Sequence, residues 1–214
     1  MRIIKKTTRK TVAGRVKGLF FIVSAPSGAG KTTLCKELCR TVPGIKHSVS
    51  YTTRPRRKGE RNNKHYFFIS QERFKTMINK KEFAEWAMVH SNLYGTAKKH
   101  LEEIINKGYD IILDIDVNGA VQMRRVYKDA SYIFILPPSM KVLEKRLSGR
   151  KSDTDDVISR RLNKARDEIS YYEDYDYIII NDKFEKALSD LQSIVRTARL
   201  KTERLDSVVL ENLR

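Results

Sequence analysis

The residues with the clearest chemical potential form one glycine-rich segment near the start of the chain. Its sequence is Ser24-Ala25-Pro26-Ser27-Gly28-Ala29-Gly30-Lys31-Thr32-Thr33. Because Gly28 and Gly30 have no Cβ, the backbone can adopt unusual φ values there and bring successive N–H groups against phosphate oxygens. Lys31 would reach the β and γ phosphates of a nucleoside triphosphate, and the Thr32 hydroxyl would join the shell of a bound Mg²⁺. The segment therefore predicts a phosphate-binding loop.

The segments on either side of this loop match the setting that it needs. The apolar run Leu19–Val23 precedes it and predicts a buried strand, while Leu34, Leu38 and Val42 recur every four residues after it and predict a helix. The full pattern has Gly where this chain has Ala25, the smallest substitute. The alternative interpretation is a glycine-rich turn in an ordinary strand-to-helix connection.

Two groups of arginines could neutralise a phosphate. Arg54 and Arg57 frame a turn and could hold one phosphate through bidentate hydrogen bonds. The second group surrounds a predicted loop at residues 149–153 and consists of Arg146, Arg150 and Arg161. Arginines on a closing lid would stabilise the charge that spreads over a transferred phosphoryl group and would exclude water. A solvated basic face is the alternative.

Glu85 is the candidate for recognising a base. It lies in a predicted strand at residues 82–89, beside Trp86. A carboxylate can accept two hydrogen bonds from a purine edge that presents N1–H and an amino group, as guanine does. Adenine has an acceptor at N1 and would leave the carboxylate unpaired, which costs roughly 1 to 3 kcal/mol or more. Taken alone, Glu85 also fits an ordinary surface acid.

Predicted strands and helices alternate along most of the chain. Besides residues 19–23, a buried strand that ends in acids is predicted at residues 109–116, and further strands are predicted at residues 132–136 and 177–180. Helical spacing of apolar residues separates these strands. Strands separated by helices imply an α/β core, with a parallel sheet covered on both faces and ligands at the carboxyl ends of the strands.

Residues 50–97 interrupt this alternation. His47–Thr53 alternate like a strand and run into an exposed basic loop that is rich in Pro, Gly and Asn. A short strand at residues 67–69, a helix at 70–80 and the strand at 82–89 follow. We therefore expect a small mixed insertion on the core.

The composition indicates a globular, basic protein of one domain with modest insertions. The 214 residues carry a formal net charge of +17, which suits either nucleic acid or a polyphosphate substrate. Seven basic residues precede the first strand with no acid among them, so the remainder carries +10. We expect residues 1–17 to be a disordered leader, with an organelle transit peptide as the alternative. No run approaches the length of a membrane span, and Cys35 and Cys39 are expected to stay reduced in the cytoplasm.

These motifs, in this order, resemble those of guanylate kinases from about residue 18 to about residue 200. The segments that carry the resemblance are Ser24–Thr33, Ser48–Arg54, Gly59-Glu60, Tyr66, Glu82–Ala87, Tyr94-Gly95, Leu113–Asp116, Pro137–Ser139, Arg146–Arg150 and Asn181-Asp182. The resemblance implies a P-loop NTPase core with a parallel sheet flanked by helices, a small mixed α/β insertion that binds the nucleoside monophosphate, and a helical lid. It also implies Mg²⁺-dependent phosphoryl transfer from ATP to GMP, giving ADP and GDP.

The resemblance further implies a division of the chain and a set of site residues. The parts would be a leader at 1–17, a core at 18–49, 98–147 and 168–206, a GMP-binding insertion at 50–97, a lid at 148–167 and a tail at 207–214. The implied catalytic residues are Lys31, Arg57, Arg150 and Arg161. The implied ATP-binding residues are Ser27, Gly28, Ala29, Gly30, Lys31, Thr32, Thr33, Arg146, Asn181 and Asp182, with Thr32 also the Mg²⁺ ligand. The implied GMP-binding residues are Ser50, Arg54, Arg57, Tyr66, Glu85, Tyr94, Thr96 and Asp116. The implied reaction requires neither a membrane nor nucleic acid, and it is compatible with a monomer or a homodimer.

Two positions depart from the family pattern as it usually runs. Pro55 stands one position early in the turn, where it restricts Arg54, and Lys151 replaces the Gly that commonly follows the first lid arginine. Three other functions remain as alternatives. They are a kinase for another phosphorylated substrate such as a sugar phosphate, a guanylate-kinase-like interaction module without catalysis, and a nucleic-acid-binding protein.

Overall fold

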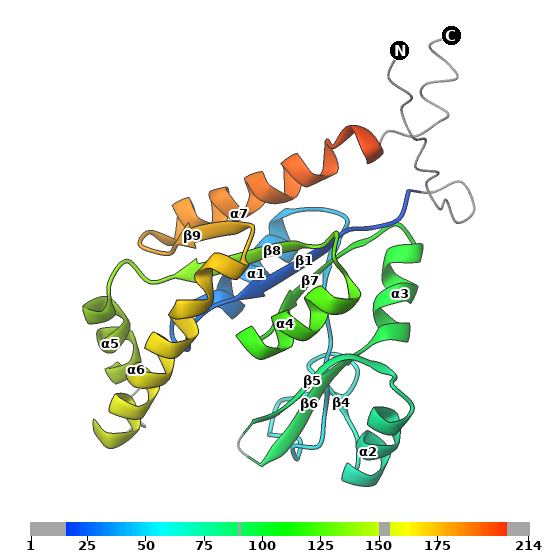
Figure 1. The fold of residues 1–214 in the computed structure, drawn as a ribbon, viewed down its shortest axis with the longest axis horizontal. Coiled ribbons are helices and arrows are strands. Elements are labelled where there is room, and N and C mark those ends of the chain that lie inside the picture. Colours follow the sequence, from blue (N-terminus) through cyan, green and yellow to red (C-terminus); the bar gives the residue numbers. More distant parts are fainter. Residues whose placement is uncertain (1–15, 90, 150–154, 205–214) are drawn as a thin grey trace.

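The computed structural model describes residues 16–89, 91–149 and 155–204, which form an α/β fold (Figure 1). Arg150, Lys151, most of the predicted leader and the whole of the predicted tail lie outside these residues. Within the described segments the strands form two sheets, one of five strands and one of four. Among the described residues, no helix is both long and apolar enough to cross a bilayer.

The larger sheet is parallel and carries the phosphate-binding loop. Its strand order is β2 (Ile45–His47), β7 (Asp110–Asp114), β1 (Phe20–Ser24), β8 (Ser131–Leu136) and β9 (Tyr177–Ile180). The apolar runs predicted as strands are therefore confirmed, and β1 lies at the centre between β7 and β8. Continuous apolar sequence suits the inner strands β7, β1 and β8 because both of their faces are covered, whereas the edge strand β9 leaves Ile178 and Ile180 exposed.

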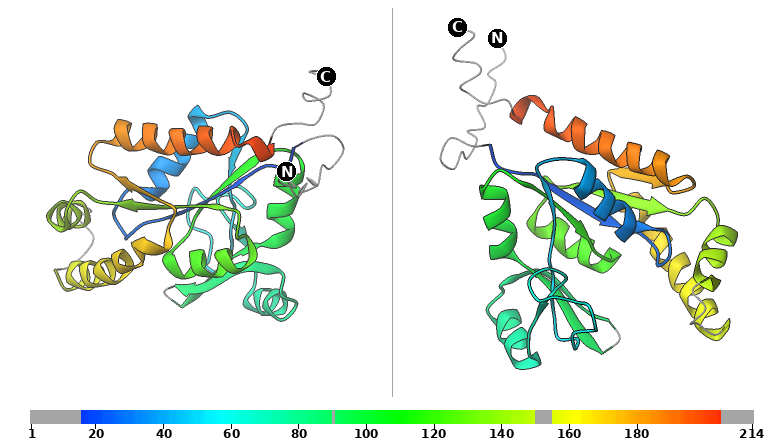
Figure 2. Two further views of the ribbon diagram at one scale, coloured as in Figure 1. Left: turned by 45° about the horizontal axis from the view of Figure 1, so that its top comes forward. Right: turned by 180° about the vertical axis from the view of Figure 1, so that it is seen from behind.

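Helices cover the two faces of this sheet, as the views in Figure 2 show. On one face α1 (Lys31–Thr41) and α7 (Phe184–Arg199) bury Leu38 and Leu191 against β1 and β8. On the other face α3 (Lys98–Asn106) and α4 (Val117–Val126) bury Leu101 and Met123 against the opposite sides of β1 and β7. The core is thus a three-layer arrangement in which the carboxyl ends of the strands stay open to ligands.

The smaller sheet lies beside the core and is mixed. Its strands run in the order β4 (Phe67–Phe68), β3 (Tyr51–Thr52), β6 (Asn92–Ala97) and β5 (Phe83–Val89), with α2 (Gln71–Asn79) packed against them. The prediction of one strand over His47–Thr53 was wrong. The segment is divided between β2 and β3, because residues 48–50 pass from one sheet to the other. Strand β6 was not predicted as a strand.

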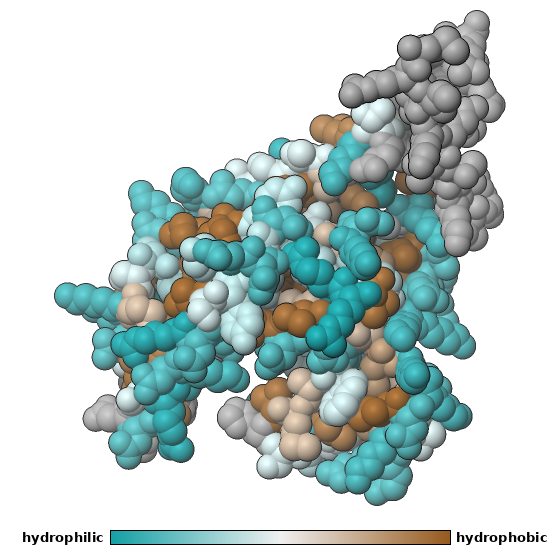
Figure 3. Space-filling model, in the orientation of Figure 1, coloured by the Kyte–Doolittle hydropathy of each residue, from teal (hydrophilic) through white to brown (hydrophobic). Residues whose placement is uncertain are grey.

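Two helices project from the core on the side opposite the smaller sheet. They are α5 (Met140–Ser148) and α6 (Asp155–Ile169), which pack together through Leu143, Leu147 and Ala165, and α6 continues into η1 (Ser170–Asp174). The space-filling view shows the surface hollowed between this pair and the smaller sheet (Figure 3). The short η2 (Thr202–Arg204) ends the described chain. The loop predicted at residues 149–153 lies almost entirely outside the described residues.

Candidate active site

The phosphate-binding loop joins β1 to α1, as its sequence predicts. Gly28 and Gly30 have φ of 95° and 93°, a left-handed conformation that side chains with a Cβ rarely adopt. A Cβ at Gly30 would also come within 2.4 Å of the Asn181 amide nitrogen. That nitrogen donates to the Ala29 carbonyl oxygen at 2.7 Å, so the buried Asn181 side chain stabilises the conformation of the loop. The N-terminal N–H groups of α1 are thereby presented at the loop, where an anion is stabilised.

Lys31 and Thr32 reach from the start of α1 to the carboxyl end of β7. The Lys31 ammonium donates to the Ile115 carbonyl oxygen at 2.6 Å, and the Thr32 hydroxyl donates to Asp114 Oδ2 at 2.7 Å. Asp114 was not among the predicted site residues. The available signal was an acid near the carboxyl end of a predicted buried strand, and the pairing of Val23 with Asp114 brings that acid beside the loop.

The environment of Asp114 keeps it ionised. Burial raises the pKa of Asp114, but His47 and Lys31 outweigh this effect, so that its pKa lies below the ordinary value. His47 Nε2 lies 3.2 Å from Asp114 Oδ1, and the two side chains form an ion pair when the imidazole is protonated. The oxygens of Thr32 and Asp114 fit Mg²⁺, which prefers oxygen ligands and completes its octahedron with water and substrate phosphates. The described residues contain no cluster of three or more His, Cys, Asp or Glu side chains that could hold a metal.

Glu85 forms the buried end of the cavity beyond the loop. Only 6% of Glu85 is exposed, so the alternative of a surface acid is wrong. The Thr96 hydroxyl donates to Glu85 Oε1 at 2.5 Å, and the Ser50 and Thr96 hydroxyl oxygens lie 3.3 Å apart. Burial raises the pKa of Glu85 to about 7. A carboxylate of this kind gains strongly from a partner that donates two hydrogen bonds.

Helix α4 closes this end of the cavity. Asp116 caps the helix by accepting the Gly119 N–H at 2.8 Å. A Cβ at Gly119 would lie 3.1 Å from Glu85 Oε2, a tight contact, so the absence of a side chain there lets the helix approach the carboxylate closely. Gln122 on the same helix exchanges hydrogen bonds of 3.1 and 2.9 Å with the backbone of Trp86. The helix therefore fixes the strand that carries Glu85.

Arg54 lies in an aromatic and acidic setting near the other end of the smaller sheet. Its guanidinium is 5.5 Å from the centre of the Tyr66 ring and pairs with Glu60 Oε1 at 2.6 Å. Tyr66 and Tyr94 pack edge to face, 5.9 Å apart. Glu60 Oε2 also accepts the Arg57 N–H at 2.8 Å, and the Glu60 N–H donates to the Arg57 carbonyl oxygen at 3.1 Å, so the turn lies at residues 57–60, after Pro55. Glu60 was recognised as part of a motif but not as a site residue.

One cavity of about 530 Å³ joins these groups. The predicted site residues that line it are Lys31, Thr32, Ser50, Tyr66, Glu85, Tyr94 and Asp116. Thr96 lies behind Glu85, whereas the Arg54 and Arg57 side chains do not line the cavity. A second cavity of about 340 Å³ is lined by the loop, and it shares Lys31, Thr32 and Asp116 with the first. The residues predicted to bind phosphate and those predicted to bind the base thus line two adjoining cavities.

The helices α5 and α6 carry two of the predicted arginines, one bound to the loop and one to Asn181 beside it. Arg161 Nη2 donates to the Ser27 hydroxyl at 2.7 Å. Arg146 Nη2 donates to the Asn181 carbonyl oxygen at 2.8 Å. Asp182 follows Asn181 and is exposed, while Arg150 lies outside the described residues.

Comparison with known proteins decides the family. The sequence model of the family described as guanylate kinase matches residues 4–198, beginning ahead of residue 18, where the recognisable motifs start. The chain belongs to the guanylate kinase family. The guanylate kinase of Geobacter metallireducens is 53% identical over 195 residues, which cover 91% of this chain and 96% of that protein. The guanylate kinase of Geobacter sulfurreducens is 51% identical over the same length and the same shares of both chains.

A solved guanylate kinase has the same fold. The crystal structure of guanylate kinase from Anaplasma phagocytophilum superposes with a TM-score of 0.71 at 35% identity, covering 89% of this chain and 90% of that one. The prediction of the family and of the P-loop fold is therefore confirmed.

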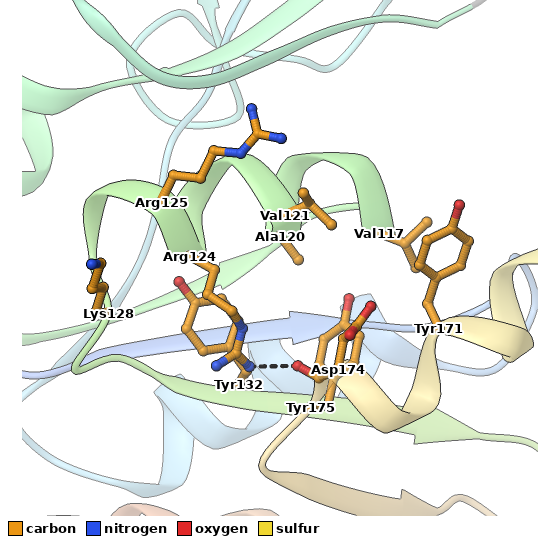
Figure 4. A pocket seen from close by; sticks show the side chains of 10 residues that line it. All are labelled: Val117, Ala120, Val121, Arg124, Arg125, Lys128, Tyr132, Tyr171, Asp174 and Tyr175. Carbon is orange, nitrogen blue, oxygen red and sulfur yellow. Dashed lines mark hydrogen bonds between the residues drawn. The ribbon is translucent and has the colours of Figure 1, made fainter.

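A further hollow of about 360 Å³ lies between α4 and η1, away from the phosphate-binding loop of this guanylate kinase family member (Figure 4). Its walls are mostly apolar and aromatic, and it contains none of the predicted site residues. Arg124 lies 3.7 Å over the Tyr132 ring and donates to the Asp174 carbonyl oxygen at 2.6 Å. This arginine ties α4 to η1 and has a structural role.

Proposed function

We propose that this chain transfers the γ-phosphoryl group of ATP to GMP, giving ADP and GDP. The observation that carries the proposal is the single cavity that runs from Lys31 and Thr32 to the buried Glu85–Thr96 pair. One end offers cationic and N–H groups to phosphates, and the other offers a carboxylate to a purine that donates twice. Membership of the guanylate kinase family supports the same reaction.

ATP would bind along the loop from Ser27 to Thr33. The loop N–H groups and Lys31 would hold the β and γ phosphates, and Arg161, which already reaches Ser27, would face the transferring group. Thr32 and Asp114 would hold Mg²⁺, which when bound neutralises charge on the phosphates. The ATP side would be completed by four residues to which the family resemblance gives this role: Arg146, Arg150, Asn181 and Asp182.

GMP would bind in the cavity beyond the loop. Glu85 would accept hydrogen bonds from N1–H and the amino group of guanine, with Ser50, Thr96 and Asp116 around it. The GMP phosphate would meet four residues of the insertion, Arg54, Arg57, Tyr66 and Tyr94. Because Arg54 is paired with Glu60 in this structure, GMP would compete for that guanidinium.

No general base is needed for this reaction. The acceptor is a phosphate that is already an anion, so alignment and neutralisation of charge carry the transfer. The lysine and arginines supply positive charge where it develops, and closure of the hollow between α6 and the smaller sheet would exclude water. The presence of this lysine and these arginines argues against an interaction module without catalysis, because such a module transfers no phosphoryl group for them to stabilise.

The proposal extends to the setting of the enzyme. ATP and GMP are cytoplasmic metabolites, and we place the activity there. Both proposed sites lie on one chain, so neither a second copy nor nucleic acid is required, although a homodimer is compatible with the reaction. A kinase for a sugar phosphate is the nearest alternative, and the buried Glu85 argues against it.

Transfer of a labelled phosphoryl group tests the proposal. ATP labelled at the γ position is incubated with Mg²⁺, GMP and the protein, and the nucleotides are separated. Label should move into GDP in amounts equal to the ADP formed, and Lys31→Ala should abolish the transfer. Release of labelled inorganic phosphate without labelled GDP would contradict the proposal.

A further inference from the structure

Glu168 is a buried carboxylate at the phosphate-binding loop for which the proposed reaction has no role. It lies in the last turn of α6, is only 8% exposed and lines the 340 Å³ cavity together with Ser27, Gly28 and Lys31. Its Oε1 is 3.7 Å from the ammonium of Lys164, which is largely exposed. Its Oε2 is buried without a hydrogen-bond partner in the described part of the chain. A buried carboxylate oxygen without a partner is costly and calls for an explanation.

Two side chains of helix α6, Arg161 and Glu168, lie at Ser27 of the loop. Arg161 donates to the Ser27 hydroxyl at 2.7 Å, and Glu168 lies seven residues, or about two turns, further along the same face. Burial raises the pKa of Glu168 above its ordinary value, and the charge of Asp116 in the same cavity adds to this, while Lys164, the Ser27 N–H and Lys31 favour the charged form. The carboxylate thus faces the positive groups that the loop offers to an anion.

A triphosphate and this carboxylate would be stabilised by the same positive groups of the loop. The loop N–H groups and Lys31 stabilise negative charge, and two anions in one buried cavity repel each other strongly because the local dielectric is low. We propose that Glu168 is a positioning residue that acts as a stand-in anion for the nucleotide-free loop and is displaced when the triphosphate of ATP enters. The inference rests on the proposed function, because it assigns the 340 Å³ cavity to the phosphates of ATP.

Equilibrium binding to an isosteric variant tests this inference. Glu168→Gln removes the charge and keeps the shape, while Asp167→Asn makes the same change at the neighbouring exposed position. Dissociation constants are measured calorimetrically for ATP and for inorganic tripolyphosphate, without Mg²⁺ so that the full charge of the ligand is felt. Glu168→Gln should bind both ligands about tenfold more tightly than the unchanged protein. Asp167→Asn should change neither constant.

GMP serves as the internal control, since its proposed site is lined by neither residue. Its dissociation constant should stay the same in both variants. Unchanged or weaker tripolyphosphate binding by folded Glu168→Gln would overturn the inference. If that variant does not fold, Glu168→Asp keeps the charge, draws it back from the loop and should tighten binding by a smaller factor; no tightening there would overturn it equally.

The proposed function fails separately from this inference. Absence of GDP formation by the unchanged protein would remove the reaction, while tripolyphosphate binding would still report on Glu168. Normal GDP formation together with no tightening in Glu168→Gln would remove only the role of Glu168.

Discussion

Replacing Glu85 by Gln should cripple the use of GMP and leave ATP binding intact. The Thr96 hydroxyl donates to Glu85 Oε1, so a Gln side chain would turn its oxygen toward Thr96 and its NH₂ group toward the base. Guanine presents donors at N1–H and at its amino group, so at these two positions donor would then face donor. Glu85→Gln removes one charge-assisted hydrogen bond and leaves one donor without a partner. Together these two effects cost about 3 kcal/mol, or roughly a 150-fold fall in kcat/KM for GMP.

Steady-state ADP release, coupled to a spectroscopic signal, measures this loss. kcat/KM for GMP is determined at saturating ATP, and the dissociation constant of ATP is measured separately. Glu82→Gln is the matched control, because it makes the same change at an exposed position three residues earlier and should have no effect. The reasoning would be refuted if Glu85→Gln kept kcat/KM for GMP within about threefold, or lost ATP affinity to the same extent.

Three further predictions follow from the geometry. Because burial raises the pKa of Glu85 to about 7, above its ordinary value, the neutral form stabilises the nucleotide-free protein at low pH, and this contribution is lost as the pH rises through 7. Glu85→Gln should therefore raise the unfolding temperature more at pH 8 than at pH 5, by an amount worth up to about 3 kcal/mol, and an equal shift at both pH values would contradict the burial argument. Asp114→Asn should raise the Mg²⁺ concentration for half-maximal activity by about tenfold or more while leaving Mg²⁺-free ATP binding nearly unchanged; an unaltered Mg²⁺ titration would remove Asp114 and its contact with Thr32 from the metal site. Gly18→Ala would place a Cβ 1.8 Å from the Tyr109 carbonyl oxygen, so denaturant unfolding should show a loss of about 2 kcal/mol or more, and a neutral result would mean that this backbone contact is looser than the structure has it.

The alternation of strands and helices could be predicted from the sequence because it depends on local periodicity. The runs of β1, β7 and β8 are apolar and buried, β9 is a short apolar run at the edge of the sheet, and the loop after β1 carries its own signature. The division of residues 47–53 between two sheets could not be predicted, because the chain leaves one sheet for the other within an alternating segment. Period alone does not say which partner strand a residue meets.

The candidate site was predictable where a motif carries it and not where distant elements meet. Lys31 and Thr32 belong to a contiguous pattern, whereas Asp114 joins them only because β7 pairs in parallel with β1. Glu85 was ambiguous between a base-reading group and a surface acid. Its burial comes from α4, whose Gly119 lies 34 positions away, and no local pattern reports that approach.

Discrimination among nucleotides tests the central claim most directly. ADP release is measured with ATP and Mg²⁺ while GMP, AMP, CMP and UMP are offered in turn, with Lys31→Ala and Glu85→Gln assayed beside the unchanged protein. The account predicts turnover with GMP alone, abolished by Lys31→Ala and strongly reduced by Glu85→Gln. Comparable turnover with AMP, or turnover with GMP that ignores Glu85→Gln, would contradict the assignment of Glu85 as the group that reads the base.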